Sequence, residues 1–134
     1  IETEVSPHIH DFVWEKLLVN AGLNALAALT GLKNGQVLDY PETLRLLEAL
    51  VSEAVEVAKR KGIRLKDNPA DRVKAVLEAT RENRCSMGQD FDYKRRTEID
   101  AINGAVVREA EHLGIAVPYN QMITDLVKVI ERRF

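Results

Sequence analysis

Apolar residues recur at helical spacing along most of the chain, and Gly or Pro stands where one such stretch gives way to the next. We expect a first helix from near Asp11 to Thr30, ended by Gly31. A second helix should begin at Pro41 and end at Gly62, because proline suits the first helical turn and glycine the residue after the last turn. Apolar positions three or four residues apart predict one buried face on each helix.

Three further helices are expected in the second half of the chain. Residues 67–70 open the third, residues 95–113 form the fourth, and Pro118 opens the last. Residues 82–92 break the helical pattern, so we expect a polar connecting loop there. No alternating strand pattern extends beyond a few residues. The predicted fold class is therefore all-α, a bundle of about five helices with short connections.

Three polar residues, Lys16, Asn20 and Asn24, form a row on the otherwise apolar first helix. Their i, i+4, i+8 spacing stacks the side chains on one helical face, each about 6 Å further along the axis. Asparagine is a poor helix former, because its amide competes for backbone hydrogen bonds. A polar pocket would explain the row, since the lysine can donate a proton and the amides can hold hydroxyl and carboxylate oxygens. The alternative is a polar seam between helices, from which the lysine reaches water.

Two more polar segments are candidates for the same pocket. Residues 83–90 form a Gly-containing stretch that includes Ser86, although plain connectors share this composition. Residues 97–104 resemble a capping sequence just inside a helix. Within them, Glu98 and Asn103 introduce an acid and an amide where a pure core helix would have neither.

Composition narrows the classes of function. The 134 residues are 46% hydrophobic and 30% charged, with a net charge of −2, which is typical of one globular domain without a broad basic face for nucleic acid or membranes. No run of about 18 apolar residues predicts a transmembrane span, and the first residues do not resemble a signal peptide. The single cysteine, Cys85, excludes an internal disulfide and suits the cytoplasm; we expect a small core or loop residue rather than a nucleophile.

Motifs for metals and phosphates are missing from the sequence. His8, His10 and His112 do not have the spacing of a metal site, so we expect no metal. The chain contains neither GxGxxG nor GxxxxGK[ST]. A dinucleotide would therefore need a phosphate cradle from outside this chain.

The chain resembles the C-terminal helical domain of the ketopantoate reductases, or 2-dehydropantoate 2-reductases, over nearly its whole length. No single motif is specific, but several occur in the family's order, at residues 14–24, 34–35, 86–90, 97–104 and 114–120. The resemblance implies an all-α domain like the C-terminal domain of 6-phosphogluconate dehydrogenase. It also implies that residues 1–134 follow an N-terminal Rossmann domain that binds NADP(H), with the substrate in the cleft between the two domains.

The resemblance also implies roles for individual residues. Lys16 matches the family's catalytic acid, and Glu98 matches a glutamate that contacts the cofactor. Four residues match the positions that bind the 2-oxo acid substrate: Asn20, Asn24, Asn34 and Ser86. Two positions depart from the loop that often reads Ser-Ser-Met-Leu-Gln-Asp in the family, because this chain has Cys85 and Gly88 there.

The implied reaction is the NADPH-dependent reduction of 2-dehydropantoate to (R)-pantoate in pantothenate biosynthesis. Without the Rossmann domain, this chain alone should not catalyse it. One alternative is a related D-2-hydroxy-acid dehydrogenase that acts on another 2-oxo acid.

A second alternative is a non-catalytic helical dimerisation module. The last helix carries apolar residues that could face a second copy of the chain, although an intramolecular core is the preferred explanation for them: Met122, Ile123, Leu126, Val127 and Ile130. A homodimer is therefore a candidate assembly under either function.

Overall fold

A computed structural model describes residues 9–134 of the chain. Within this range the protein is entirely helical and contains no strand, which confirms the predicted fold class. The elements are α1 (Ile9–Thr30), η1 (Gly35–Leu38), α2 (Pro41–Arg60), α3 (Pro69–Ala79), α4 (Ser86–Asp92), η2 (Ile99–Ala101), α5 (Asn103–Leu113) and α6 (Pro118–Arg132), where η denotes a 3₁₀ helix.

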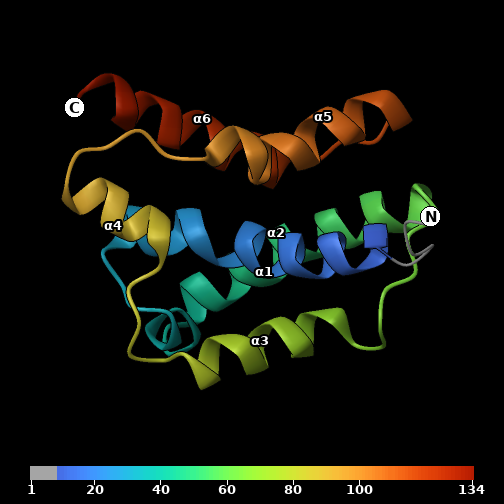
Figure 1. Ribbon diagram of the computed structural model, residues 1–134, viewed down its shortest axis with the longest axis horizontal. Coiled ribbons are helices and arrows are strands. Elements are labelled where there is room, and N and C mark those ends of the chain that lie inside the picture. The colour runs from blue at the N-terminus through green and yellow to red at the C-terminus, as the bar shows by residue number, and fades with distance from the viewer. Residues whose placement is uncertain (1–8) are drawn as a thin grey trace, which may run out of the picture.

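Helix α1 lies at the centre of the bundle. In Figure 1, α3 runs along one side of α1 and α2, the pair α5 and α6 runs along the other side, and α4 sits beside the C-terminal end of α1. Every residue from 21 to 28 is buried, because α1 packs against α2, α3, α4 and α6. An apolar helix with neighbours on most sides forms the core of the domain.

The composition of α1 also meets a membrane criterion. Residues His10–Thr30 are long and apolar enough to cross a bilayer, and this is the only such helix in the part of the chain described. However, 56% of the apolar window is buried inside the bundle. We therefore interpret α1 as a core helix.

Two fully buried asparagines join four helices. Asn103, the first residue of α5, donates from Nδ2 to the carbonyl oxygen of Ala21 in α1 (3.0 Å) and to Oδ1 of Asn120 in α6 (2.9 Å). Asn120 donates in turn to the carbonyl oxygen of Leu50 (3.2 Å) and to Oε1 of Glu53 (2.9 Å), both in α2. This network fixes the register of α5 against α1.

Two boundaries differ from the sequence-based expectation. Ser86–Asp92 is helix α4 rather than loop, because Cys85 caps it: its Sγ accepts the backbone N–H of Gly88 at 3.3 Å. The fourth predicted helix starts at Asn103, not near Arg95, and Glu98 precedes the short helix η2. The predicted starts at Pro41 and Pro118 are confirmed.

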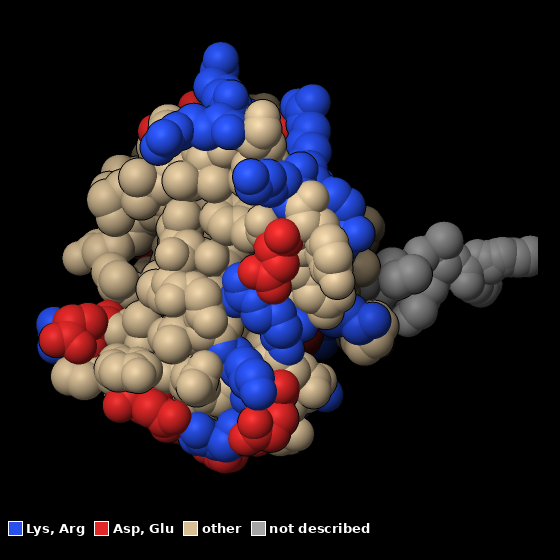
Figure 2. Space-filling model, turned by 90° about the vertical axis from the view of Figure 1, so that its left-hand side faces the viewer, with Lys and Arg blue, Asp and Glu red and all other residues tan. Residues whose placement is uncertain are grey.

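Basic and acidic side chains share the surface at the end of the bundle that carries α4. Figure 2 shows this end, with lysines and arginines along its top and right and acids among and below them. Three arginines of the segment 81–95 pair with carboxylates there, in the ion pairs Arg81–Asp39, Arg84–Asp92 and Arg95–Asp90.

Candidate functional site

A cavity of about 570 Å³ opens between α1, α4 and the segment from η2 to α5. Five of the six predicted site residues line it: Lys16, Asn20, Asn24, Ser86 and Glu98. Apolar walls come from Leu17, Met87 and Ile102. The fold thus brings together three segments that are far apart in the sequence.

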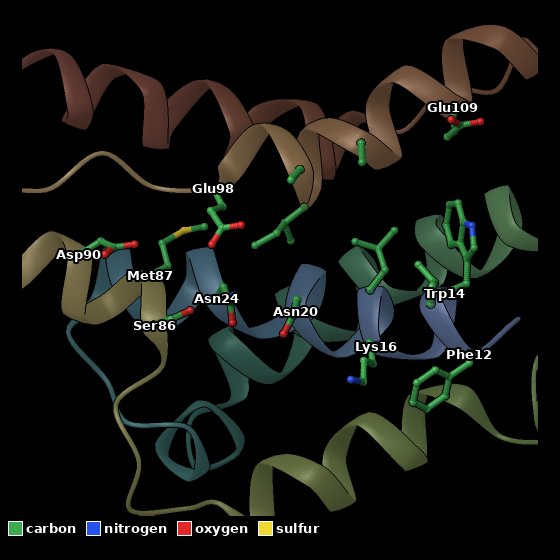
Figure 3. A pocket seen from close by; sticks show the side chains of 15 residues that line it. Phe12, Trp14, Lys16, Asn20, Asn24, Ser86, Met87, Asp90, Glu98 and Glu109 are labelled. Atoms are coloured by element: carbon green, nitrogen blue, oxygen red, sulfur yellow. The ribbon is translucent and has the colours of Figure 1, made fainter. Parts of the chain in front are cut away.

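The polar side chains of the cavity come from one face of α1, from the first residue of α4 and from the residue before η2. In Figure 3, Lys16, Asn20 and Asn24 follow one another along α1, Ser86 begins α4, and Glu98 reaches down from the start of η2. Asn24 is buried, whereas Lys16, Asn20, Ser86 and Glu98 are exposed. Lys16 is exposed because its side chain lies at the cavities that border α1 and not in the packed core.

The polar side chains of the site are available to a ligand. Within the described part of the chain, the side chains of Asn20, Asn24, Ser86 and Glu98 make no hydrogen bond to protein. Amide and hydroxyl groups offer both donors and acceptors, and a carboxylate offers acceptors. The Asn24 amide lines the cavity, so a ligand or water there can form hydrogen bonds with it.

The acids of the site are not equivalent. Asp90 pairs with Arg95 at 3.3 Å, and Glu109 pairs with Lys61 at 2.8 Å. The hydrogen bond from Lys61 lowers the pKa of Glu109 below its ordinary value. Glu98 has no cationic partner among the residues described, so its carboxylate is the acid available to a ligand.

Lys16 rests against an aromatic ring. Its Nζ lies 4.9 Å from the ring centroid of Phe12, one turn earlier in α1, which is the distance of a cation–π contact. In Figure 3 this amine is on the lower side of α1, whereas Glu98 approaches from above. Phe12, Lys16 and Asn20 also line a second cavity, of about 890 Å³, between α1 and α3. The lysine therefore stands on a ridge between two hollows.

Asn34 is the predicted site residue that does not line the cavity. It precedes η1, where its Nδ2 donates to Oγ1 of Thr80 (3.0 Å) and its backbone N–H donates to the carbonyl oxygen of Asn83 (2.9 Å). Its Oδ1 is buried without a hydrogen-bond partner in the structure. Asn34 thus holds the segment that leads into α4.

Cys85 is buried, and that burial raises the pKa of its thiol, which does not suit a nucleophile. No group of three or more His, Cys, Asp or Glu side chains could hold a metal ion within residues 9–134, and His8 lies outside that range. Phe12 and Glu109 are cavity residues that the sequence analysis did not identify. The helical spacing of Phe12 from Lys16, four residues, was the available signal for the first.

Comparison with known proteins identifies the family model "Ketopantoate reductase PanE/ApbA C terminal" over residues 8–131. A 2-dehydropantoate 2-reductase of Halobacterium salinarum is 39% identical over 132 residues, which cover 98% of this chain and 44% of that protein. The chain thus spans less than half the length of this curated relative.

Solved structures agree with the sequence match. A PanE/ApbA family ketopantoate reductase from Ralstonia eutropha superposes with a TM-score of 0.90 and 32% identity, over 99% of this chain and 45% of that one. D-mandelate dehydrogenase, in a ternary structure with NADH and anilino(oxo)acetate, superposes with a TM-score of 0.88 and 28% identity. The match covers 96% of this chain and 54% of that one. A dimeric ketopantoate reductase from Staphylococcus aureus superposes with a TM-score of 0.86 and 25% identity, over 99% of this chain and 46% of that one.

Proposed function

The chain belongs to the family of ketopantoate reductase C-terminal domains, and from that premise we propose that it is the catalytic and substrate-binding domain of a cytoplasmic 2-dehydropantoate 2-reductase. Residues 1–134 would follow a Rossmann domain that binds NADP(H). The complete protein would reduce 2-dehydropantoate to (R)-pantoate for pantothenate biosynthesis.

One observation carries this proposal: polar side chains from three segments line one cavity, and four of them have no protein partner among the residues described. The exposed side of α1 supports a second domain as the missing wall of the cavity. The residues also fit a nicotinamide cofactor in part, because the Glu98 carboxylate can accept hydrogen bonds from sugar hydroxyls. The cofactor, when bound, supplies hydride to the carbonyl carbon of the substrate.

Lys16 would stabilise the developing alkoxide and then protonate it. Negative charge grows on the carbonyl oxygen as the C–H bond forms, and an ammonium beside that oxygen lowers the energy of the transition state. Asn20, Asn24 and Ser86 would hold the carboxylate and hydroxyl groups of the substrate with neutral donors. Because these groups are uncharged, they would orient the substrate without competing with Lys16 for the alkoxide.

Two residues have special positions in this scheme. Lys16 must turn from the Phe12 ring toward the cavity, a side-chain rotation that the exposed ridge permits. Asn34 matches a substrate-binding position of the family, and its contacts with Thr80 and Asn83 support an indirect contribution through the segment before Ser86.

The test uses the complete protein that contains this chain and follows NADPH oxidation with 2-dehydropantoate. We expect Lys16→Met to lower kcat by about 10²–10⁴-fold, the range for a general acid. Lys74→Met is the matched control, because Lys74 pairs with Glu48 away from the cavity. If Lys16→Met kept the turnover of the Lys74→Met variant, the acid role of Lys16 would be wrong.

The likeness to D-mandelate dehydrogenase favours one second candidate: a reductase of another 2-oxo acid that uses NADH. The same residues would act on it, because they recognise the 2-oxo acid group. Parallel assays with NADH, NADPH and several 2-oxo acids separate the two functions. If a folded protein that binds the cofactor reduced none of these acids, the non-catalytic alternative would stand.

We also propose that a second copy of the chain packs on α6. The predicted apolar stripe of this helix divides: Ile123 and Val127 are buried and Ile130 is partly buried, whereas Met122 and Leu126 are about half exposed. Together with Val129, which was not part of the predicted stripe, Met122 and Leu126 line a shallow groove. The dimeric Staphylococcus aureus relative supports self-association. Sedimentation of a Leu126→Glu variant would test it, with a shift from dimer to monomer expected and an unchanged mass refuting the interface.

A further inference from the structure

Arg84, two residues before α4, engages its whole guanidinium group in hydrogen bonds within the protein. Its Nη1 donates to the carbonyl oxygens of Ala27 (2.7 Å) and Leu32 (3.0 Å), at and beyond the last turn of α1. Its Nη2 donates to the carbonyl oxygen of Gly88 (3.2 Å) and to Oδ1 of Asp92 (3.2 Å), and Nε donates to Oδ2 of Asp92 (3.1 Å). A guanidinium has five N–H donors, and all five are engaged here.

Gly88 makes room for this arginine. A Cβ atom at position 88 would lie 2.5 Å from Cζ of Arg84 and 2.7 Å from both Nε and Nη1. The guanidinium is fixed by its five hydrogen bonds, so it cannot move aside without breaking several of them. A side chain at position 88 would therefore require the guanidinium to shift and lose part of this hydrogen bonding.

Cys85 adds a second link between the same two helices. Its Sγ lies 3.6 Å from the carbonyl oxygen of Asn24, to which the thiol can donate, and it accepts the backbone N–H of Gly88. Asn24 and Ala27, the two α1 residues contacted, are about one helical turn apart. Arg84 and Cys85 therefore hold the start of α4 on consecutive turns of α1, and the next residue, Ser86, enters the cavity beside Asn24.

We propose that Arg84 is a positioning residue for the substrate, which sets the separation between Ser86 of α4 and Asn24 of α1, and that Gly88 is required because the guanidinium lies where its Cβ would be. This inference rests on the proposed function. It makes the two departures from the usual family loop, Cys85 and Gly88, parts of one clamp that depends on Arg84.

Loss of these contacts should affect the binding of the 2-oxo acid and not the binding of the cofactor. Ser86 and Asn24 are the proposed contacts of the 2-oxo acid, whereas Glu98, the proposed contact of the cofactor, lies before η2 and receives no bond from Arg84. Loss of the clamp should therefore raise KM for the 2-oxo acid and leave KM for the cofactor unchanged. A residue with only a structural role would instead lower the amount of active protein.

The experiment measures both KM values, kcat and α4 hydrogen exchange in the complete protein. We expect Arg84→Met to raise KM for the 2-oxo acid at least tenfold, Arg84→Lys to give an intermediate value, and Arg60→Met, an exposed arginine in an i,i+4 pair on α2, to change nothing. Gly88→Leu alone should also raise this KM. In the double variant Arg84→Met, Gly88→Leu, we expect KM to fall back below the value of Gly88→Leu, because the leucine then fills the vacated space.

Two results would overturn the proposal: an unchanged KM for the 2-oxo acid in Arg84→Met, or effects of the two substitutions that simply multiply in the double variant. Failure of the proposed function is a separate result. If the unaltered protein reduced no 2-oxo acid, hydrogen exchange would decide: faster exchange of the α4 amides in Arg84→Met, but not in Arg60→Met, would support the clamp, and equal exchange would refute it.

Discussion

Replacing Asn120 by alanine tests the buried amide network most directly. Asn120 is fully buried, and its side chain takes part in three hydrogen bonds, with Asn103, Leu50 and Glu53. The truncation removes all three and leaves one N–H of the Asn103 amide buried without an acceptor. The carbonyl of Leu50 and the carboxylate of Glu53 are less affected, because Glu53 keeps the backbone N–H groups of residues 119 and 120.

The expected cost follows from these losses. Each hydrogen bond contributes about 0.5–1.5 kcal/mol net, and a buried unsatisfied donor costs about 1–3 kcal/mol, so we expect a loss of about 3 kcal/mol in the free energy of unfolding. An unfolding entropy of about 2.1 cal/mol/K per residue gives about 0.28 kcal/mol/K for 134 residues. The melting temperature should therefore fall by about 10 °C.

Thermal unfolding of the purified chain, followed by circular dichroism at 222 nm, measures this shift. Gln121→Ala is the matched control: it removes an amide from the same helix, but Gln121 is exposed and its side chain donates to Asp125 at 3.1 Å. We expect the control to stay within about 0.5 kcal/mol of the unaltered protein. Equal melting temperatures for the two variants would show that the network contributes no stability.

Three further predictions concern the neighbourhood of the site. Burial raises the pKa of the Cys85 thiol, so alkylation by iodoacetamide at pH 8 should be much slower in the folded chain than in urea, and equal rates would refute its burial. Hydrogen bonds from Arg84 lower the pKa of Asp92 below its ordinary value of 3.8, so the ionised carboxylate stabilises the folded protein. This contribution to stability is present above about pH 4 and is lost as the pH falls through the lowered pKa. The difference in melting temperature between the unaltered protein and Asp92→Asn should therefore shrink from pH 7 to pH 3, and a constant difference would contradict the pairing. Phe12→Leu releases Lys16 from a contact worth about 0.5–1 kcal/mol, so kcat/KM of the complete protein should rise by up to about fivefold. A tenfold fall would show that the ring assists catalysis.

The sequence predicted most of the fold because its helices have strong local signals. Pro41 and Pro118 start helices where predicted, and Gly31 and Gly114 end them with the positive φ that glycine tolerates. The polar row on α1 was also predictable, because i, i+4 spacing alone puts Lys16, Asn20 and Asn24 on one face.

Features that depend on tertiary contacts could not be predicted in the same way. Helix α4 has only seven residues and is capped by a cysteine, which is not among the preferred capping residues. The sequence made Asn103 a candidate site residue, yet it is fully buried and donates a hydrogen bond to Asn120. This could not be predicted, because the sequence around an asparagine does not show which distant residue will bond to its amide. The position of Asn34 outside the cavity was equally unpredictable, because its side chain bonds to Thr80, which is 46 residues away in the sequence.

Helix α1 contributes to both the core and the candidate site, and this restricts how the protein can evolve. The helix provides the centre of the core through residues 21–28 and the polar row of the site through its neighbouring face. Asn24 belongs to both, so a substitution there that altered the chemistry would also disturb the packing, and this part of α1 offers few adaptive steps. The short elements α4 and η2 touch the cavity from the edge of the bundle and carry less of the core. Selection for a new substrate should therefore accumulate changes in α4 and η2 while α1 stays nearly constant.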